Sequence, residues 1–479
     1  MSADDGELRL PIKLDAASNG EFAPVALPAW CVTANRLARE RTDANARRLG
    51  LPRRRFLLSA CGAATTLLAL GEACARAGRS GGAFELPPES AFEPALAEAM
   101  LGGSELIFDV QNHHVAPERP WRERSAFWDR TIRAFPFADC GLPDPIGCFS
   151  ARQYVKEVFA DSDTTMAVLS FVPEPDRDAA PLRIEEAAAT RAIVDSMEGT
   201  GRLLIHGAVH PGFPGELERM EELAARWKVA AWKTYTQYGP GGRGYRLDDE
   251  KLGIPFLEKA RALGVRVVCV HKGFPLPGMA YEHSLCDDVG RAAKLFPDLH
   301  FLVYHSGFET QTVEGPYDPA RARSGTDSLV RALEQNGIAP GSNVYAELGS
   351  TWRYLMRDPT QAAHALGKLL RAAGEDNLLW GTDSIWYGSP QDQIQAFRTF
   401  QISEALRERH GYPELTPRLR AKIFGENALR PYGIAKDDAL RRAAHARAKL
   451  PAEARDPGFE THGPRTRREF LRFLRESRC

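Results

Sequence analysis

The chain has 479 residues, of which 43% are hydrophobic and 26% are charged, and its formal net charge at pH 7 is -1. This is the composition of an ordinary globular protein. The balanced charge gives no reason to expect nucleic acid or an anionic membrane as a partner, and no apolar run reaches the roughly 18–20 residues of a membrane-spanning helix. The length admits one large domain with extensions, or two or three small ones.

The first eighty residues differ from the rest. Three arginines at 53–55 precede an apolar stretch, 56–70, and the small-x-small triplet Ala75-Arg76-Ala77 follows it. This is the order of a secretory signal, and the arginines before Phe56 resemble the twin-arginine export motif. We therefore expect residues 1–77 to be a leader read by the twin-arginine translocon, which gives an exported, periplasmic protein. A short core helix is the alternative, and the protein would then stay in the cytoplasm.

Five cysteines lie beyond this leader, an odd number without CxxC spacing. The pattern argues against a disulfide scaffold or a zinc ribbon. A disulfide between Cys140 and Cys148, which are eight residues apart in one loop, is still possible in an oxidising compartment. The five are Cys140, Cys148, Cys269, Cys286 and Cys479.

From about residue 100, short apolar runs alternate with longer amphipathic segments, several of which end in the glycine typical of helix ends. Eight strands alternating with helices over roughly 330 residues predict a (β/α)8 TIM barrel spanning residues 78–435. A doubly wound open sheet is disfavoured because no Gly-x-Gly-x-x-Gly follows a candidate first strand. The predicted strands are 106–110, 166–172, 203–209, 229–235, 265–271, 299–305, 344–348 and 378–382.

Two further segments lie around this barrel pattern. The stretch "GPGGRG" at 239–244 lacks the Lys-Ser/Thr of a phosphate-binding loop, so we interpret it as a flexible loop of the active site. Residues 436–479 form a charged helical extension that closes with "RTRREFLRFLRESRC". This predicts a basic amphipathic helix, packed back on the barrel or, alternatively, docking a partner subunit. Whether the protein forms a homo-oligomer stays open.

Polar side chains follow the ends of seven predicted strands, where barrel enzymes place their catalytic groups. Gln111 and His113 are two apart after the first strand, so their side chains point the same way. Two histidines that end adjacent strands, His271 and His305, combine with Asp383 after the eighth. Imidazole and carboxylate together suit Zn²⁺ and neighbouring divalent metals. The other strand-end histidines, His114, His206 and His210, are interpreted mainly as hydrogen-bonded structural residues.

The motifs "FDVQNHHV", "VHKG", "YHSG", "WGTDS" and "AKIFGENALRPYGI" occur in this order between about Phe108 and Tyr432. Here the chain resembles the amidohydrolase superfamily, in the amidohydrolase-related branch that contains the aminocarboxymuconate-semialdehyde decarboxylases. The family carries His-x-His on the first strand, one His each on the fifth and sixth, and an Asp on the eighth. The resemblance therefore implies a metal held by His113, His271, His305 and Asp383, with Zn favoured over Mn.

Gln111 departs from the family pattern, which has a histidine there. Its amide oxygen is a weaker ligand than imidazole. Gln111 is then a donor beside the metal, a ligand of a loosely held ion such as Mn²⁺, or the mark of a vacant site. Lys233 occupies about the position of the carboxylated lysine that bridges two metals in binuclear members. We favour one metal, with Lys233 contacting a substrate carboxylate or pairing with Glu347.

The resemblance leads us to expect a hydrolase acting on an amide, ester or lactone. Asp383 is the general base toward the metal-bound water, and His305 or His271 stabilises the oxyanion. The alternatives are a metal-dependent, non-oxidative decarboxylase of a ring-bearing or unsaturated carboxylic acid, and a metal-free binding protein derived from such an enzyme. Aromatic residues such as Trp352 and Trp386 favour a small ring-bearing substrate. Candidates for a basic clamp over the metal are Lys233, Lys272, Arg243 and Arg353.

Overall fold

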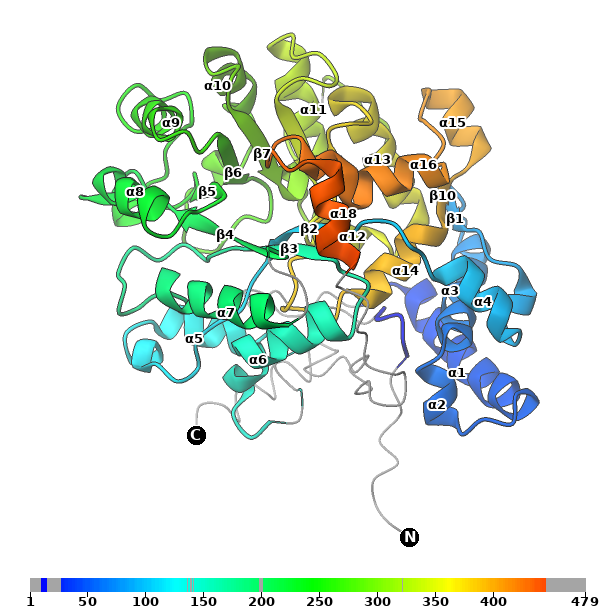
Figure 1. Ribbon diagram of the computed structural model, residues 1–479. Helices are drawn as coiled ribbons and strands as arrows, with labels where there is room; N and C mark the ends of the chain where they lie inside the picture. The colour runs from blue at the N-terminus through cyan, green and yellow to red at the C-terminus, as the bar shows by residue number, and fades with distance from the viewer. Residues whose placement is uncertain are drawn as a thin grey trace.

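In the computed structural model, eight parallel strands form one sheet whose order follows the sequence, and helices surround it (Figure 1). The N–H of Val110 donates to the C=O of Trp380 at 3.0 Å, which joins the first strand to the end of the last. The predicted (β/α)8 barrel is thereby confirmed. The structure describes residues 10–14, 27–135, 137, 140, 142–197, 201–320 and 322–444.

Seven of the eight strands are shorter than predicted, some at their amino ends and some at their carboxyl ends, and the first keeps its length but lies two residues further along. The first begins at Phe108, and the last holds only Leu378 and Leu379 in the ladder. The polar residues that follow leave the sheet and turn over its rim, which is where a barrel carries its site. The strands are β2 (Phe108–Asn112), β3 (Met166–Leu169), β4 (Leu203–Ala208), β5 (Ala231–Tyr235), β6 (Val267–His271), β7 (His300–Tyr304), β8 (Val344–Glu347) and β9 (Leu378–Leu379).

The outer helices form where apolar residues repeat on one face and a capping residue precedes them. In α13 (Pro359–Ala373), the Asp358 side chain accepts hydrogen bonds from the N–H groups of Thr360 and Gln361, and proline stands at the first position. Further helices are α5 (Ala126–Arg133), α6 (Ala151–Tyr154), α7 (Ile184–Ser196), α8 (Glu216–Ala225), α9 (Gly253–Ala262), α10 (Val289–Leu295), α11 (Thr326–Gln335), α12 (Thr351–Leu355), α14 (Gln391–Thr399), α15 (Glu404–His410), α16 (Pro417–Ala421), α17 (Asn427–Leu429) and α18 (Lys436–Ala444).

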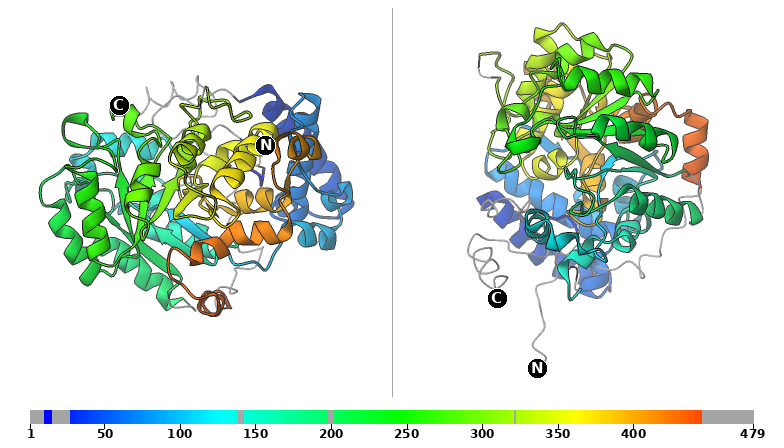
Figure 2. Two further views of the ribbon diagram at one scale, coloured as in Figure 1. Left: turned by 90° about the horizontal axis from the view of Figure 1, so that it is seen from above. Right: turned by 90° about the vertical axis from the view of Figure 1, so that its left-hand side faces the viewer.

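The N-terminal helices pack against one side of the barrel, beside α14 (Figures 1 and 2). They are α1 (Ala29–Arg48), α2 (Arg53–Leu57), α3 (Ala60–Arg76) and α4 (Pro94–Leu101). The apolar run expected as the core of an export signal forms α3, in which twelve of seventeen residues are buried. In the structure this run is therefore largely a buried helix, and export of the protein stays a prediction. In the described part of the chain, no helix is both long and apolar enough to cross a membrane.

The burial of α3 predicts a specific loss of stability. Leu67 is fully buried in the main core cluster, whereas the neighbouring Leu68 is partly exposed. Leu67→Ala is expected to cost about 2–5 kcal/mol of unfolding free energy, because it leaves a cavity as well as losing buried surface. Leu68→Ala should cost clearly less. Chemical denaturation of both variants checks this, and equal small effects would contradict a packed α3.

Two smaller features complete the fold. β1 (Gly82–Phe84) and β10 (Phe400–Ile402) form a separate antiparallel pair at the edge of the barrel. Cys140 and Cys148 are joined by a disulfide, as their spacing allowed. The predicted closing helix, 465–479, lies outside the described residues.

Candidate functional site

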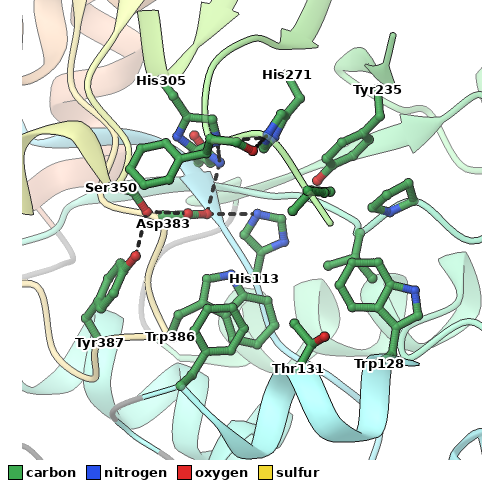
Figure 3. Close-up of a pocket in the computed structure, with 16 residues that line it drawn as sticks. His113, Trp128, Thr131, Tyr235, His271, His305, Ser350, Asp383, Trp386 and Tyr387 are labelled. Atoms are coloured by element: carbon green, nitrogen blue, oxygen red, sulfur yellow. Dashed lines mark hydrogen bonds and ion pairs between the residues drawn. The ribbon is translucent and has the colours of Figure 1, made fainter. Parts of the chain in front are cut away.

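A cavity lies at the carboxyl ends of the barrel strands, and Figure 3 shows the side chains that converge on it. All five residues predicted as metal ligands, the doubtful one included, line this cavity. They come from β2, β6 and the segments that follow β7 and β9, so four separate strand ends build one site. The five are Gln111, His113, His271, His305 and Asp383.

Asp383 is the centre of the polar contacts. Its Oδ2 accepts a hydrogen bond from the Ser350 hydroxyl at 2.6 Å, and its Oδ1 accepts one from the Gln111 amide at 2.9 Å. The same Oδ1 lies 3.1 Å from His113 Nε2. Burial alone would raise the pKa of this carboxyl, but the bonds with His113 and Ser350 and the nearby imidazoles bring that pKa below its ordinary value. Asp383 is therefore ionised at neutral pH.

His271 and His305 have their tautomers set by backbone carbonyls. His305 Nδ1 lies 2.6 Å from the Gly349 oxygen, and His271 Nε2 lies 3.1 Å from the Phe274 oxygen. Because a carbonyl only accepts, these two nitrogens carry the protons. Burial lowers the pKa of His305 to about 4 and that of His271 well below its usual value, so both rings are neutral. Their other nitrogens, 3.2 Å apart, present lone pairs to each other.

Gln111 lies between these acceptors. Its amide nitrogen is 2.9 Å from Asp383 Oδ1 and 3.3 Å from His305 Nε2, so it donates one hydrogen to each. Its amide oxygen is buried and has no hydrogen-bond partner. Gly349 makes room for it, since a Cβ there would lie 2.3 Å from that oxygen. Gln111 thus serves as a hydrogen-bond donor in the place where the family pattern has a histidine.

The fit of this site to a metal divides into chemistry and geometry. Two neutral imidazoles with lone pairs facing each other, each held by a carbonyl on its far side, are typical of metal ligands, as is an ionised carboxylate beside them. Among the described residues, however, no group of three or more His, Cys, Asp and Glu side chains is arranged to hold a metal ion. The imidazole and carboxylate groups suit a divalent cation as ligands. In the present arrangement, however, the Gln111 amide nitrogen lies between Asp383 and His305.

Backbone strain is concentrated at the cavity. Of the six non-glycine residues with positive φ in the described part of the chain, four line it. Such conformations cost about 1–3 kcal/mol each and persist where the surrounding structure imposes them, most often at functional sites. The four are Phe274, His305, Ser350 and Asp383, with φ between 37° and 65°.

Lys233 and Glu347 lie beneath the cavity and do not line it. The Lys233 ammonium is fully buried, has no hydrogen-bond partner, and sits 3.8 Å from the centre of the Tyr304 ring. Burial lowers its pKa to about 8. Glu347 accepts hydrogen bonds from the N–H groups of His305 at 3.0 Å and Gly349 at 2.6 Å, and burial raises its pKa to about 8. Glu347 therefore holds the loop of His305, and neither Lys233 nor Glu347 lines the cavity.

The two predicted tryptophans have different places. Trp386 lines the cavity and stacks on His113 and on Phe135, with ring centres 5.3 and 4.6 Å apart. Trp352 is fully buried in the core, where its ring packs edge-on against Phe397. Trp352 is therefore a packing residue and not part of the cavity wall.

No arginine or lysine is among the described residues that line the cavity. Lys272 is buried and paired with Asp288 at 2.8 Å. Arg353 is buried outside the cavity, and Arg243 is exposed. The basic clamp considered from the sequence is thus not formed by these residues.

Sequence reasoning missed Ser350, and it expected Tyr387 only as one of the aromatic side chains around the mouth of the site. The Tyr387 hydroxyl donates a hydrogen bond to Ser350 Oγ at 2.8 Å, and the Ser350 hydroxyl donates one to Asp383, so the three side chains form a hydrogen-bonded chain. Ser350 follows the seventh strand by three residues, which was the only local signal for it. The hydrogen bond between Tyr387 and Ser350 depends on how the loop after β9 folds, and only the structure shows it.

Comparison with known proteins gives a family and a set of similar barrels. Residues 146–434, more than half of the chain, match the model of a family described as amidohydrolase. A search of curated proteins gives no match. A 5-carboxyvanillate decarboxylase from Sphingomonas paucimobilis is 16% identical, with a TM-score of 0.42, over 69% of this chain and 100% of its own.

Two more solved structures are similar at the same level. A 5-carboxyvanillate decarboxylase from Novosphingobium aromaticivorans, with bound manganese and 3-methoxy-4-hydroxy-5-nitrobenzoic acid, is 14% identical over 69% of this chain and 98% of its own, with a TM-score of 0.45. A putative 2-pyrone-4,6-dicarboxylic acid hydrolase from Pseudomonas putida is 16% identical over 69% and 98%, with a TM-score of 0.39. At such identities the likeness concerns the fold.

Proposed function

Because the chain belongs to the amidohydrolase family, we propose that it is an enzyme that removes the carboxyl group of a small ring-bearing or unsaturated carboxylic acid without oxidation. This places decarboxylation ahead of the hydrolysis that the sequence suggested first. The observation that carries the proposal is the division of the cavity into a polar floor and aromatic walls. Asp383 is the one carboxyl group among the described residues that line it.

The walls favour loss of a carboxyl group on physical grounds. Trp128, Phe135, Phe274 and Trp386 surround the polar floor with rings, and a planar substrate can stack between them. A carboxylate is strongly disfavoured in apolar surroundings, whereas neutral CO₂ is not. The described walls offer no lysine or arginine to stabilise a carboxylate there. Apolar walls next to the scissile bond therefore promote departure of CO₂.

The balance of the reaction assigns a role to Asp383. When the bond between the ring carbon and the carboxyl carbon breaks, its electron pair stays on the ring carbon, and that carbon must receive a proton. Asp383 faces the cavity and is held by Ser350 and Gln111. It takes up the carboxyl proton of the incoming acid before the bond breaks and returns that proton to the ring carbon afterwards. Ser350 and Tyr387 keep its carboxylate oriented for this transfer.

A divalent metal is part of the proposal, with zinc first and manganese second. His113, His271, His305 and Asp383 supply the donor types that hold such an ion, and the Gln111 amide must then turn away from Asp383 and His305. When bound, the ion supplies positive charge that fixes and polarises the oxygen atoms of the substrate. Gln111 is then free to donate a hydrogen bond to the substrate.

Hydrolysis of an ester or lactone is the second candidate, and one observation favours it. Asp383 is ionised at neutral pH and accepts several hydrogen bonds, which suits a general base toward water as well as a proton carrier. The two reactions differ in their products. Only the first releases CO₂, and only the second forms a new acid from a neutral substrate.

The test is a product assay on purified protein after metal analysis. The protein is loaded with zinc or manganese and incubated with hydroxybenzoic acids and, separately, with aryl esters and lactones. We expect CO₂ release from a ring-bearing acid, dependent on the metal, and no acid formation from the neutral panel. Acid formation alone would establish the hydrolase. Thermal stabilisation by ring compounds without turnover of either panel would favour the metal-free binding protein.

A further inference from the structure

A short N-terminal strap, residues 10–14, reaches the loop that carries Asp383. We propose that Lys13 in this strap is a positioning residue of the candidate site. Its ammonium donates hydrogen bonds to the backbone oxygens of Tyr387 at 2.7 Å and Ser389 at 2.8 Å. Lys13 is only 2% exposed and lies more than 370 residues before its partners in sequence. The contact therefore joins the start of the chain to the rim of the cavity.

The strap is fixed by apolar contacts on both sides. Ile12 and Leu14 are 0% and 1% exposed and belong to the main core cluster. Leu10 packs in a smaller cluster with Leu37 of α1 and Leu57 of α2. The strap thus lies between the N-terminal helices and the barrel, which holds the Lys13 side chain in place.

The contact reaches Asp383 through two side chains. Lys13 holds the backbone of Tyr387, the Tyr387 hydroxyl donates to Ser350 at 2.8 Å, and Ser350 donates to Asp383 at 2.6 Å. The Tyr387 ring lies on the cavity wall, so a shift of its backbone moves both the wall and the end of this chain. Lys13 itself does not line the cavity, and it acts on the site only through Tyr387.

Asp392, in the first turn of α14, balances the charge of Lys13. Its Oδ1 lies 3.5 Å from the Lys13 ammonium, and its Oδ2 accepts the Lys13 N–H at 3.2 Å. Asp392 is fully buried. Removal of the ammonium would leave this carboxylate without its countercharge and two backbone oxygens without their donor, and such groups are costly in a protein interior. An aliphatic side chain at position 13 therefore cannot hold the loop.

The strap also bears on processing of the chain. Cleavage after Ala77, which the predicted export signal requires, would remove Lys13 together with α1, α2 and α3. The inference therefore includes retention of residues 10–76 in the working protein. This inference rests on the proposed function only in that both involve Asp383. The evidence for it is the packing and hydrogen bonding of Lys13, and it does not depend on which reaction is catalysed.

The test is hydrogen–deuterium exchange of the peptide covering residues 383–394, measured without substrate. Lys13→Met should speed exchange there by at least about tenfold, because two bonds from a charged donor to this backbone are lost. Lys368→Met is the matched control, since Lys368 is also 2% exposed and paired with two carboxylates, Glu314 and Asp327. It should leave exchange at 383–394 unchanged.

A second variant separates positioning from general stability. Lys13→Met combined with Asp392→Asn removes the unpaired buried charge, so it should recover part of the lost thermal stability while exchange at 383–394 stays fast. Wild-type exchange in either variant would overturn the proposal, as would a natural protein whose N-terminus lies at residue 78 by mass spectrometry. Because no turnover is measured, these results stand whether or not the decarboxylase proposal fails.

Discussion

Asp383→Asn is expected to reduce turnover by at least about a thousandfold, since it removes both the proton carrier and a negative charge of the site. An asparagine cannot take up and return a proton at neutral pH. Its amide would also turn a donor toward Ser350 or toward Gln111, both of which donate to Asp383. Turnover of the substrate found in the product assay measures the effect, with circular dichroism to confirm the fold.

Ser350→Ala is the matched comparison, because it deletes one hydrogen bond to Asp383 and keeps the carboxylate. We expect a loss of roughly tenfold, in line with one hydrogen bond to a charged group. Its pH–rate profile should shift upward on the acidic side, since the Ser350 bond helps to lower the pKa of Asp383. Equal turnover in Asp383→Asn and the wild type would remove Asp383 from the mechanism.

The stability of the fold is expected to fall steeply as the pH drops from about 6.5 to 4. Burial lowers the pKa of His114 and of His210 to about 4, against about 6.5 in an unfolded chain. Between these values the unfolded chain binds protons that the folded one does not, so acid favours unfolding. Each histidine contributes up to about 3 kcal/mol, all of it present above pH 6.5 and lost toward pH 4. Urea unfolding at pH 7.5, 6 and 5 measures the trend.

His210→Phe tests the cause of this acid sensitivity. Both ring nitrogens of His210 are buried without a hydrogen-bond partner, and the ring packs edge-on against Phe213 and Tyr238. A phenyl ring can keep the packing and cannot titrate. The variant should therefore lose less stability between pH 6.5 and 5 than the wild type. An identical pH dependence would show that His210 does not contribute to it.

The barrel and the polar residues that line its cavity could be predicted because both follow from local patterns. Strand and helix periodicities repeat eight times, and His113, His271, His305 and Asp383 each stand at a strand end, where the fold itself brings them together. The choice among the three roles considered for Gln111 could not be made in this way. It depends on the tautomer of His305 and on the space beside Gly349, which only the assembled site defines.

The N-terminal region shows why a pattern can be ambiguous. An apolar, alanine-rich run after three arginines suits an export signal and a buried helix equally well. The structure has it as α3 because distant elements, α1 and α14, cover it. Similarly, Ser350 and Tyr387 meet Asp383 only through loops, and Lys13 through a segment that no local signal connected to the site.

The reach of Lys13 has a consequence for the order of folding during synthesis. Lys13 leaves the ribosome 374 residues before Tyr387, which at about 5–20 residues per second is a delay of roughly 20–75 s. Through this time Ile12 and Leu14 lack the parts of the core cluster that the barrel supplies, and such distant pairings slow folding. The strap can close only after β9 has joined the sheet, so the last step of assembly completes the site. A newly synthesised chain is therefore inactive and exposed to aggregation until the strap meets the loop after β9.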